Sequence, residues 1–197
     1  MRKALLYLFL IVAASGFQDN KTNVKKWVVT SGCSLKVDGS TNVNNFSCII
    51  AEYSNPDTII ATINSSQSVG LSGNIKLDIQ KFNCHNPVMT SDLRKTLKAK
   101  EFPKLMIRFI SLSQYPDIAA RNTFTKGIVM IELAGITKRF DVNYKIVSVT
   151  NNFINMIGTR QVNFSDFKIT PPSRLGGMIR TNNEINVVFD LKLKVFE

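Results

Sequence analysis

The sequence lacks most of the residues and motifs on which enzymes and metal sites depend. Among its 197 residues there is one histidine, His85, and the three cysteines form no Cys-x-x-Cys pair. It contains no P-loop, no G-x-G-x-x-G after a predicted strand and no G-x-S-x-G nucleophile turn. No internal repeat or low-complexity run divides it. We therefore expect a non-enzymatic protein of one folded domain, without a cofactor or a bound metal.

Two short segments do bring reactive groups together. Cys84 and His85 offer a thiol beside an imidazole, but adjacent residues of a strand point to opposite faces, so the pair is poorly aimed. Asp166 lies between Phe164 and Phe167, and aromatic neighbours can raise the pKa of such a carboxyl group. The simpler interpretations are a loop histidine and a turn-forming aspartate.

The first residues are typical of an export signal. Two basic residues precede an apolar run over 4–14, and small residues follow at 14–16. The run is short for a bilayer span, so we expect cleavage after residue 16, with an uncleaved anchor as the alternative. Residues 17–26 are predicted to be a flexible leader and 27–197 a single domain. A periplasmic or secreted protein is the resulting expectation.

The chain is basic, with 25 Lys and Arg against 14 Asp and Glu and a formal charge of +11. Its positive residues are scattered over polar strand faces rather than gathered in one block. A basic exported protein can make transient contact with anionic membranes, acidic glycans or nucleic acid, but charge scattered in this way is more typical of a solvated basic surface. Nucleic-acid binding is not expected, because it needs exposed aromatic residues, and the aromatic residues here fall on apolar faces.

What the sequence has in abundance is alternation of apolar and polar residues. Over 139–146, residues Phe140, Val142, Tyr144 and Ile146 share one face, and charged or amide residues occupy the other. The same period of two recurs over 75–79 and 187–195. Many strands with one apolar face close around a shared interior. The pattern therefore predicts a mainly β fold, an antiparallel barrel of eight strands, with a sandwich as the alternative.

One segment has a different period. Residues 89–100 have the chemistry of a short α-helix, with Thr90 or Ser91 as its cap, Leu93 and Leu97 on one face and lysines in the last turn. Around it we expect a polar loop over 65–73, a strand over 75–83, and two separate late strands over 153–157 and 161–164. Gly158 and Gly135 look like turn glycines.

Three cysteines in an exported chain leave one unpaired. Cys33 and Cys48 flank the predicted turn near residues 40–41 and are candidates for a cross-hairpin bridge. Pairing of Cys48 with Cys84 closes a longer loop and restricts the unfolded chain more, so we favour it. Three free thiols are the remaining alternative.

Several ordered motifs resemble the YceI-like family of exported lipid- or polyisoprenoid-binding proteins. They are S-L-K-V-D-G-S-T-N-V at 34–43 with Phe46 after it, the helix and P-x-x-x-I-x-F strand over 89–109, and Gly127 followed by E-L-A-G-I-T-K at 132–138. D-F-K-I at 166–169, a Pro-Pro…Leu-Gly-Gly loop over 171–177 and a closing strand over 184–193 complete the set. The resemblance spans residues 27–196.

This resemblance implies a lipocalin-like barrel that holds an isoprenoid or acyl chain in its lumen for transport, storage or stress protection, and that often forms a homodimer. Our candidates for a phosphate or carboxylate headgroup are Arg94, Lys98 and Arg174. The candidates for the lumen wall are the inward apolar residues Leu77, Ile79, Leu105, Ile107, Phe109, Val129, Ile131, Phe140, Val142, Tyr144, Phe189 and Leu191. The alternative is a side-chain-filled barrel that binds other proteins.

Overall fold

The computed structural model describes residues 23–116, 124–150 and 152–196. Within them the chain is mainly β, with one α-helix, α2 (Pro87–Thr96), and three short 3₁₀ turns. No helix in these ranges is long and apolar enough to cross a membrane. The strands are β1 (Asn23–Val29), β2 (Cys33–Thr41), β3 (Asn45–Tyr53), β4 (Thr58–Ile63), β5 (Val69–Asp78), β6 (Lys104–Leu112), β7 (Phe124–Leu133), β8 (Ile136–Val149), β9 (Phe153–Asn163), β10 (Ser173–Arg174) and β11 (Ile179–Phe196).

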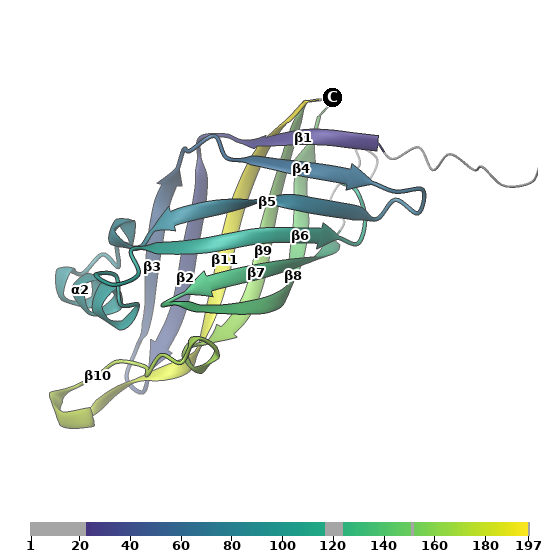
Figure 1. Ribbon diagram of the computed structural model, residues 1–197. Helices are drawn as coiled ribbons and strands as arrows, with labels where there is room; N and C mark the ends of the chain where they lie inside the picture. Colours follow the sequence, from purple (N-terminus) through teal and green to yellow (C-terminus); the bar gives the residue numbers. More distant parts are fainter. Residues whose placement is uncertain (1–22, 117–123, 151, 197) are drawn as a thin grey trace, which may run out of the picture.

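Eight of these strands form a closed antiparallel barrel, which confirms the predicted fold class. Neighbours follow the order β1, β4, β5, β6, β7, β8, β9 and β11, and β11 pairs with β1 to close the ring. The closing contact is short: it runs from Lys26 opposite Phe196 to Val29 opposite Leu193. Figure 1 shows β11 crossing the whole length of the barrel.

β11 is long enough to have two partners on the same edge. Its last residues pair with β1, while residues 181–190 pair with β2. A turn at residues 30–32 separates β1 from β2, and Gly32 adopts a φ of +83° there, which glycine tolerates best. β3 pairs with β2 and extends the sheet beyond the ring. At this second end the sheet does not close on itself.

The helix α2 covers the open end of the barrel. An isolated bridge joins Ile49 of β3 to Asn83, and a disulfide joins Cys48 of β3 to Cys84 just before the helix. Leu93 and Leu97 of this segment are buried against the barrel interior, as their spacing predicts. Figure 1 places α2 beside the ends of β5 and β6.

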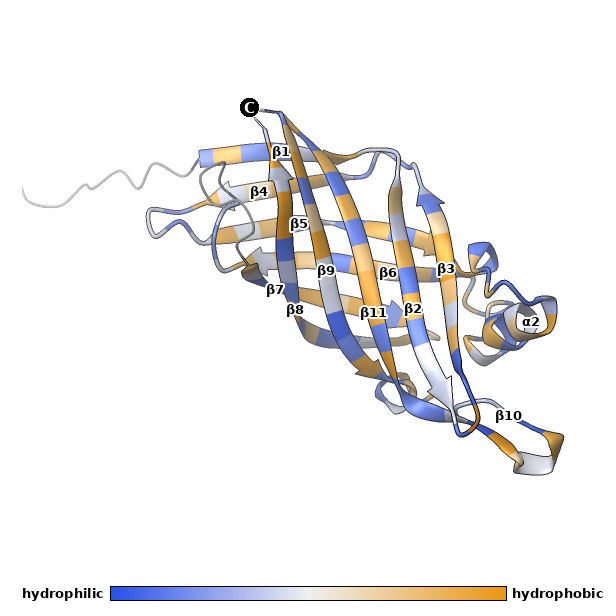
Figure 2. Ribbon diagram, turned by 180° about the vertical axis from the view of Figure 1, so that it is seen from behind, coloured by the Kyte–Doolittle hydropathy of each residue, from blue (hydrophilic) through white to orange (hydrophobic). Residues whose placement is uncertain are grey.

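The alternation in the sequence becomes the inside and outside of the barrel. Phe140, Val142, Tyr144 and Ile146 are buried, and the residues between them are exposed. Figure 2 shows the same rule as alternating orange and blue bands along β9 and β11. Near the closed end the interior is filled with side chains that are at most 1 % exposed: Trp27, Ile59, Ala61, Ile75, Ile154, Met156, Leu191 and Leu193.

Tyr144 lies within this filled part, and its burial raises the pKa of the phenol. Two glycines in strands make room for its ring. A Cβ atom at Gly127 would lie 2.6 Å from the ring, and one at Gly158 would lie 2.8 Å from it. Gly158 is therefore a packing glycine within β9 and not a turn glycine, whereas Gly135 does lie in the turn between β7 and β8.

Several predicted boundaries were wrong. The first strand begins at Asn23, so the predicted leader over 17–26 overlaps β1. β5 begins at Val69 within the predicted polar loop and ends at Asp78, where the 3₁₀ turn η1 (Ile79–Lys81) starts. β9 is one continuous strand. The predicted signal over 1–16 lies outside the described residues.

The helix also begins earlier than predicted. Asn86 is its cap, because the side-chain oxygen accepts hydrogen bonds from the amides of Val88 and Met89 at 2.9 and 3.0 Å. Pro87 occupies the first turn, where its missing N–H is no loss. The helix ends at Thr96, and residues 97–101 form turns rather than further helix.

Asp166 has a structural role in the 3₁₀ turn η2 (Phe164–Phe167). Its carboxylate accepts a hydrogen bond from the Asn163 amide at 2.9 Å and pairs with the Lys138 ammonium at 2.8 Å. The bond from Lys138 holds the pKa of this carboxyl below its usual value, so the rise that aromatic neighbours can cause is absent here. The alternative, a turn-forming aspartate, is confirmed.

We predict that Asp166→Asn lowers the free energy of unfolding by about 1 kcal/mol at neutral pH. A carboxyl whose pKa is depressed in the fold stabilises it above the unfolded-state pKa, and this contribution disappears as pH falls through the folded-state pKa. The difference between wild type and variant should therefore shrink below about pH 4. Urea unfolding across pH measures it, with Asp141→Asn on the exposed face of β8 as the charge-matched control. A difference independent of pH would contradict the role of the ion pair.

Candidate functional site

A wholly apolar cavity of about 60 Å³ lies beneath α2, at the open end of the barrel. Side chains from β2, β6, β7, β9, β11 and the helix surround it, and none of them presents a polar group to it. Such a space excludes water and accepts apolar groups. It is lined by Leu35, Val37, Phe82, Leu93, Leu97, Leu105, Ile107, Ile131, Leu133, Val162, Phe164, Phe167, Ile185 and Val187.

The structure divides the predicted lumen residues into two groups. Leu105, Ile107 and Ile131 line the cavity. The others are buried in the interior without lining the cavity: Leu77, Ile79, Phe109, Val129, Phe140, Val142, Tyr144, Phe189 and Leu191. Ile131 is partly buried, and the other eleven residues are buried. For all twelve, contact with a ligand stays a prediction.

An open cleft of about 290 Å³ adjoins the cavity. Leu93 of α2 and Phe164 of η2 line both spaces, so their side chains form the partition between them. The cleft wall is mixed, with the apolar residues Val43, Val88, Met89 and Ile179 and the charged residues Asp92 and Arg174.

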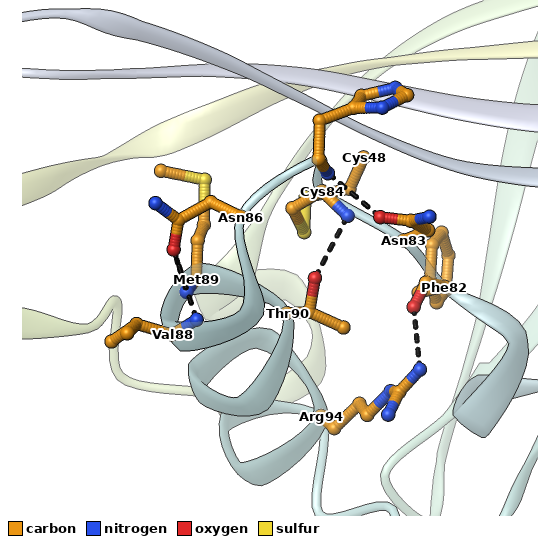
Figure 3. The surroundings of a disulfide bond; sticks show 10 residues. Cys48, Phe82, Asn83, Cys84, Asn86, Val88, Met89, Thr90 and Arg94 are labelled. Atoms are coloured by element: carbon orange, nitrogen blue, oxygen red, sulfur yellow. Dashed lines mark hydrogen bonds between the residues drawn. A yellow bond between two sulfur atoms is a disulfide. The ribbon is translucent and has the colours of Figure 1, made fainter.

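Four contacts hold the helix over the cavity, and Figure 3 shows how they surround the disulfide. The amide of Cys84 donates to the hydroxyl of Thr90 at 3.0 Å, and the Asn86 side chain caps the first turn. The guanidinium of Arg94 donates to the carbonyl oxygen of Phe82 at 2.9 Å. The Cys48–Cys84 bond, the pairing that the sequence favours, anchors this assembly to β3.

The three headgroup candidates do not meet. Arg174 lines the cleft and pairs with Asp92 of α2. Arg94 and Lys98 line a separate groove on another side of the helix. Arg94 also bonds the Phe82 carbonyl, which gives it a structural contact. Only Arg174 of the three therefore lies beside the cleft.

The Cys84 and His85 pair does not form a nucleophilic site. Cys84 has no thiol in the disulfide, and His85 is an exposed residue with a φ of +57°. Cys33 is the free cysteine, and burial raises the pKa of its thiol, so it is held in the unreactive protonated form.

Comparisons of the sequence and the fold with known proteins identify the family. The model of the YceI-like domain matches residues 18–193, nearly the whole chain. This chain belongs to the YceI-like family. No curated protein matches this YceI-like chain in sequence.

Solved structures share the barrel at low sequence identity. Burkholderia cenocepacia BcnA is 10 % identical with a TM-score of 0.61, over 81 % of this YceI-like chain and 95 % of BcnA. A polyisoprenoid binding domain from Saccharophagus degradans, implicated in plant cell wall breakdown, is 10 % identical with a TM-score of 0.57, over 85 % and 97 %. The Campylobacter jejuni YCEI protein is 16 % identical with a TM-score of 0.55, over 72 % and 82 %. At these identities the likeness shows a common fold.

Sequence reasoning missed the partition and most of the cleft. Phe164 ends a predicted strand, Ile179 lies between the predicted loop over 171–177 and the closing strand, and no pattern in the sequence brings the two together. The signals that do point there are the resemblance of D-F-K-I at 166–169 and the Pro-Pro…Leu-Gly-Gly loop. Because the cleft joins three distant segments, only the fold brings it together.

We predict that removing the disulfide by Cys48→Ala with Cys84→Ala lowers the free energy of unfolding by about 3–4 kcal/mol, because a loop with a sequence separation of 36 is released in the unfolded chain. Amide exchange in α2 should increase more than exchange in β8, since the bond anchors the helix locally. Cys33→Ala, which removes a cysteine but no cross-link, is the control. Equal effects of both changes on α2 exchange would argue against an anchoring role.

Proposed function

We propose that this protein binds the apolar chain of an isoprenoid- or acyl-type lipid at the open end of the barrel, without catalysing a reaction. The observation that carries the proposal is the cavity beneath α2, whose lining is entirely apolar. Placement in the YceI-like family and the barrel shared with a polyisoprenoid binding domain support it.

The size of the cavity determines how a lipid would fit. At about 60 Å³ it is smaller than the ~300–1,000 Å³ of common ligand pockets. One end of a chain would occupy the cavity and the rest would lie in the adjoining cleft. This requires the side chains of Leu93 and Phe164 to turn aside. Each methylene group transferred from water would contribute about 0.8 kcal/mol.

Arg174 is the headgroup candidate that this placement favours. Its guanidinium stands at the cleft and is already paired with Asp92. An anionic headgroup would compete with Asp92 for the guanidinium, and planar bidentate pairing suits either partner. Arg94 and Lys98 lie too far round the helix to share in this contact.

Export to an oxidising compartment is part of the proposal. The basic and apolar start of the sequence has the order of a signal peptide. The Cys48–Cys84 disulfide is typical of proteins outside the cytosol. We propose a periplasmic or secreted location and, from the family resemblance, association into a homodimer.

A barrel that acts only through protein contacts is the second candidate function. The densely packed interior around Trp27, Ile75 and Leu193 favours it, because that part of the barrel has no room for a ligand. The two functions differ in one measurable respect: the first requires a lipid to occupy the open end.

We predict that Val187→Phe, which places a ring in the cavity, abolishes retention of a polyprenol or a fatty acid while leaving the fold intact. Val187 lines the cavity and is only partly buried, so the added volume has space. Native mass spectrometry after incubation with each lipid measures retention. The matched control is Val147→Phe, the same change on the outer face of β8. A wild-type protein that shows only its polypeptide mass in both incubations would favour the protein-binding barrel.

A further inference from the structure

Large apolar side chains protrude around the mouth of the cleft. Leu175 and Met178, at the tip of the loop after β10, are 70 % and 74 % exposed. Val43 in the β2–β3 turn and Val88 in the first turn of α2 are also exposed, and both line the cleft. In Figures 1 and 2 the loop after β10 extends beyond the barrel on the same end as α2.

Hydrogen bonds and an ion pair tie these protruding segments into one rim. The Asn42 side chain donates to the carbonyl of Met178 at 2.9 Å and accepts from the amide of Arg180 at 2.8 Å, which fixes the β2–β3 turn to the loop. The pair between Arg174 and Asp92 fixes the same loop to α2. We name Val43, Val88, Leu175 and Met178 the apolar rim. Because its three segments are bonded together, the rim is presented as a unit.

The backbone of the loop adds an independent observation. Leu175 adopts a φ of +51°, a left-handed conformation that is unfavourable for a bulky residue by about 1 kcal/mol or more. Gly176 and Gly177, at +64° and +93°, share that region without strain. Because the Leu175 side chain is 70 % exposed, this backbone strain is explained when the side chain has a function on the surface.

Positive charge flanks the rim. In the sequence, Arg180 and Arg174, which is paired with Asp92, border Leu175 and Met178, and the whole chain carries a formal charge of +11. Protruding apolar side chains beside arginines are suited to the interface of an anionic bilayer. There the apolar side chains enter the boundary of the acyl region and the arginines contact the headgroups.

We propose that the apolar rim docks the mouth of the cleft onto an anionic lipid bilayer. The proposed lipid function enters this inference in one respect: docking would allow a lipid chain to pass between the bilayer and the cleft. A second protein is a poorer occupant. Four side chains at the tips of turns expose far less than the about 800 Å² per partner that a stable protein interface buries.

The test compares sedimentation with vesicles of phosphatidylcholine and phosphatidylglycerol in equal parts and with vesicles of phosphatidylcholine alone. It uses the protein from residue 17, which keeps every described residue and removes the predicted signal. The expected result is binding to the anionic vesicles that weakens with added salt. Leu175→Asp with Met178→Asp should lower the partition coefficient by about tenfold or more, because two inserted side chains are lost.

The control is Phe124→Asp with Phe153→Asp, which introduces the same two negative charges at exposed residues, 71 % and 49 % exposed, at the starts of β7 and β9 away from the rim. It should bind vesicles as the wild type does. Aspartate tolerates the left-handed conformation better than leucine, so Leu175→Asp should not lower the free energy of unfolding. Native mass spectrometry of each variant with a polyprenol separates the two proposals: loss of vesicle binding with retained lipid uptake isolates docking.

Three results would overturn docking. The first is vesicle binding that the double change in the rim does not affect. The second is an equal loss of vesicle binding in the Phe124 and Phe153 control. The third is a rim variant that changes from dimer to monomer while it still binds vesicles. The last would assign the rim to contact between two copies of the chain. Vesicle binding that persists in a protein unable to retain any lipid would leave docking intact and refute the proposed function instead.

Discussion

The structure depends on one edge of one strand. β11 offers hydrogen-bonding groups along 18 residues, but β1 and β2 share its free edge in turn. Where β1 pairs, the ring closes; where β2 pairs, the sheet continues into β3 and stays open. Unpaired backbone groups and apolar side chains at that opening need a cover. The helix α2 is that cover, and the bridge from Ile49 to Asn83 and the disulfide at Cys48 attach it.

This constraint gives the barrel two unlike ends. In the closed part, inward side chains meet across a narrow ring and fill it, which is common in barrels of eight strands. In the open part, Leu93 of the helix and Leu97 just after it cover the interior but leave an apolar space of about 60 Å³. The cavity is thus a consequence of how the sheet fails to close, and its walls come from many segments.

Patterns in the sequence predict the repeated strands of this structure. They do not predict the features that depend on contacts between distant segments. Alternation placed Phe140, Val142 and Tyr144 inside, because a strand has only two faces. The motifs and their order pointed to the right family. The cap at Asn86 was missed because Thr90 and Ser91 compete as caps in the sequence, and the structure uses Thr90 to bond Cys84 instead. The sequence favours a turn at Gly158 because it does not reveal the close approach of the Tyr144 ring from another strand. The candidate site was predicted least well, since neither the cavity nor the cleft follows one element.

The position of the arginines links these features to function. Arg94 bonds the Phe82 carbonyl and so helps to close the helix over the cavity, while Arg174 holds the loop after β10 to the same helix through Asp92. Screening or competition at the exposed Arg174 pair would loosen that loop from α2, because exposed ion pairs are weak and respond to nearby charge. An anionic bilayer supplies such a charge at the mouth. The surface that would attract the protein to a membrane therefore also contains the ion pair that holds the loop after β10 to α2.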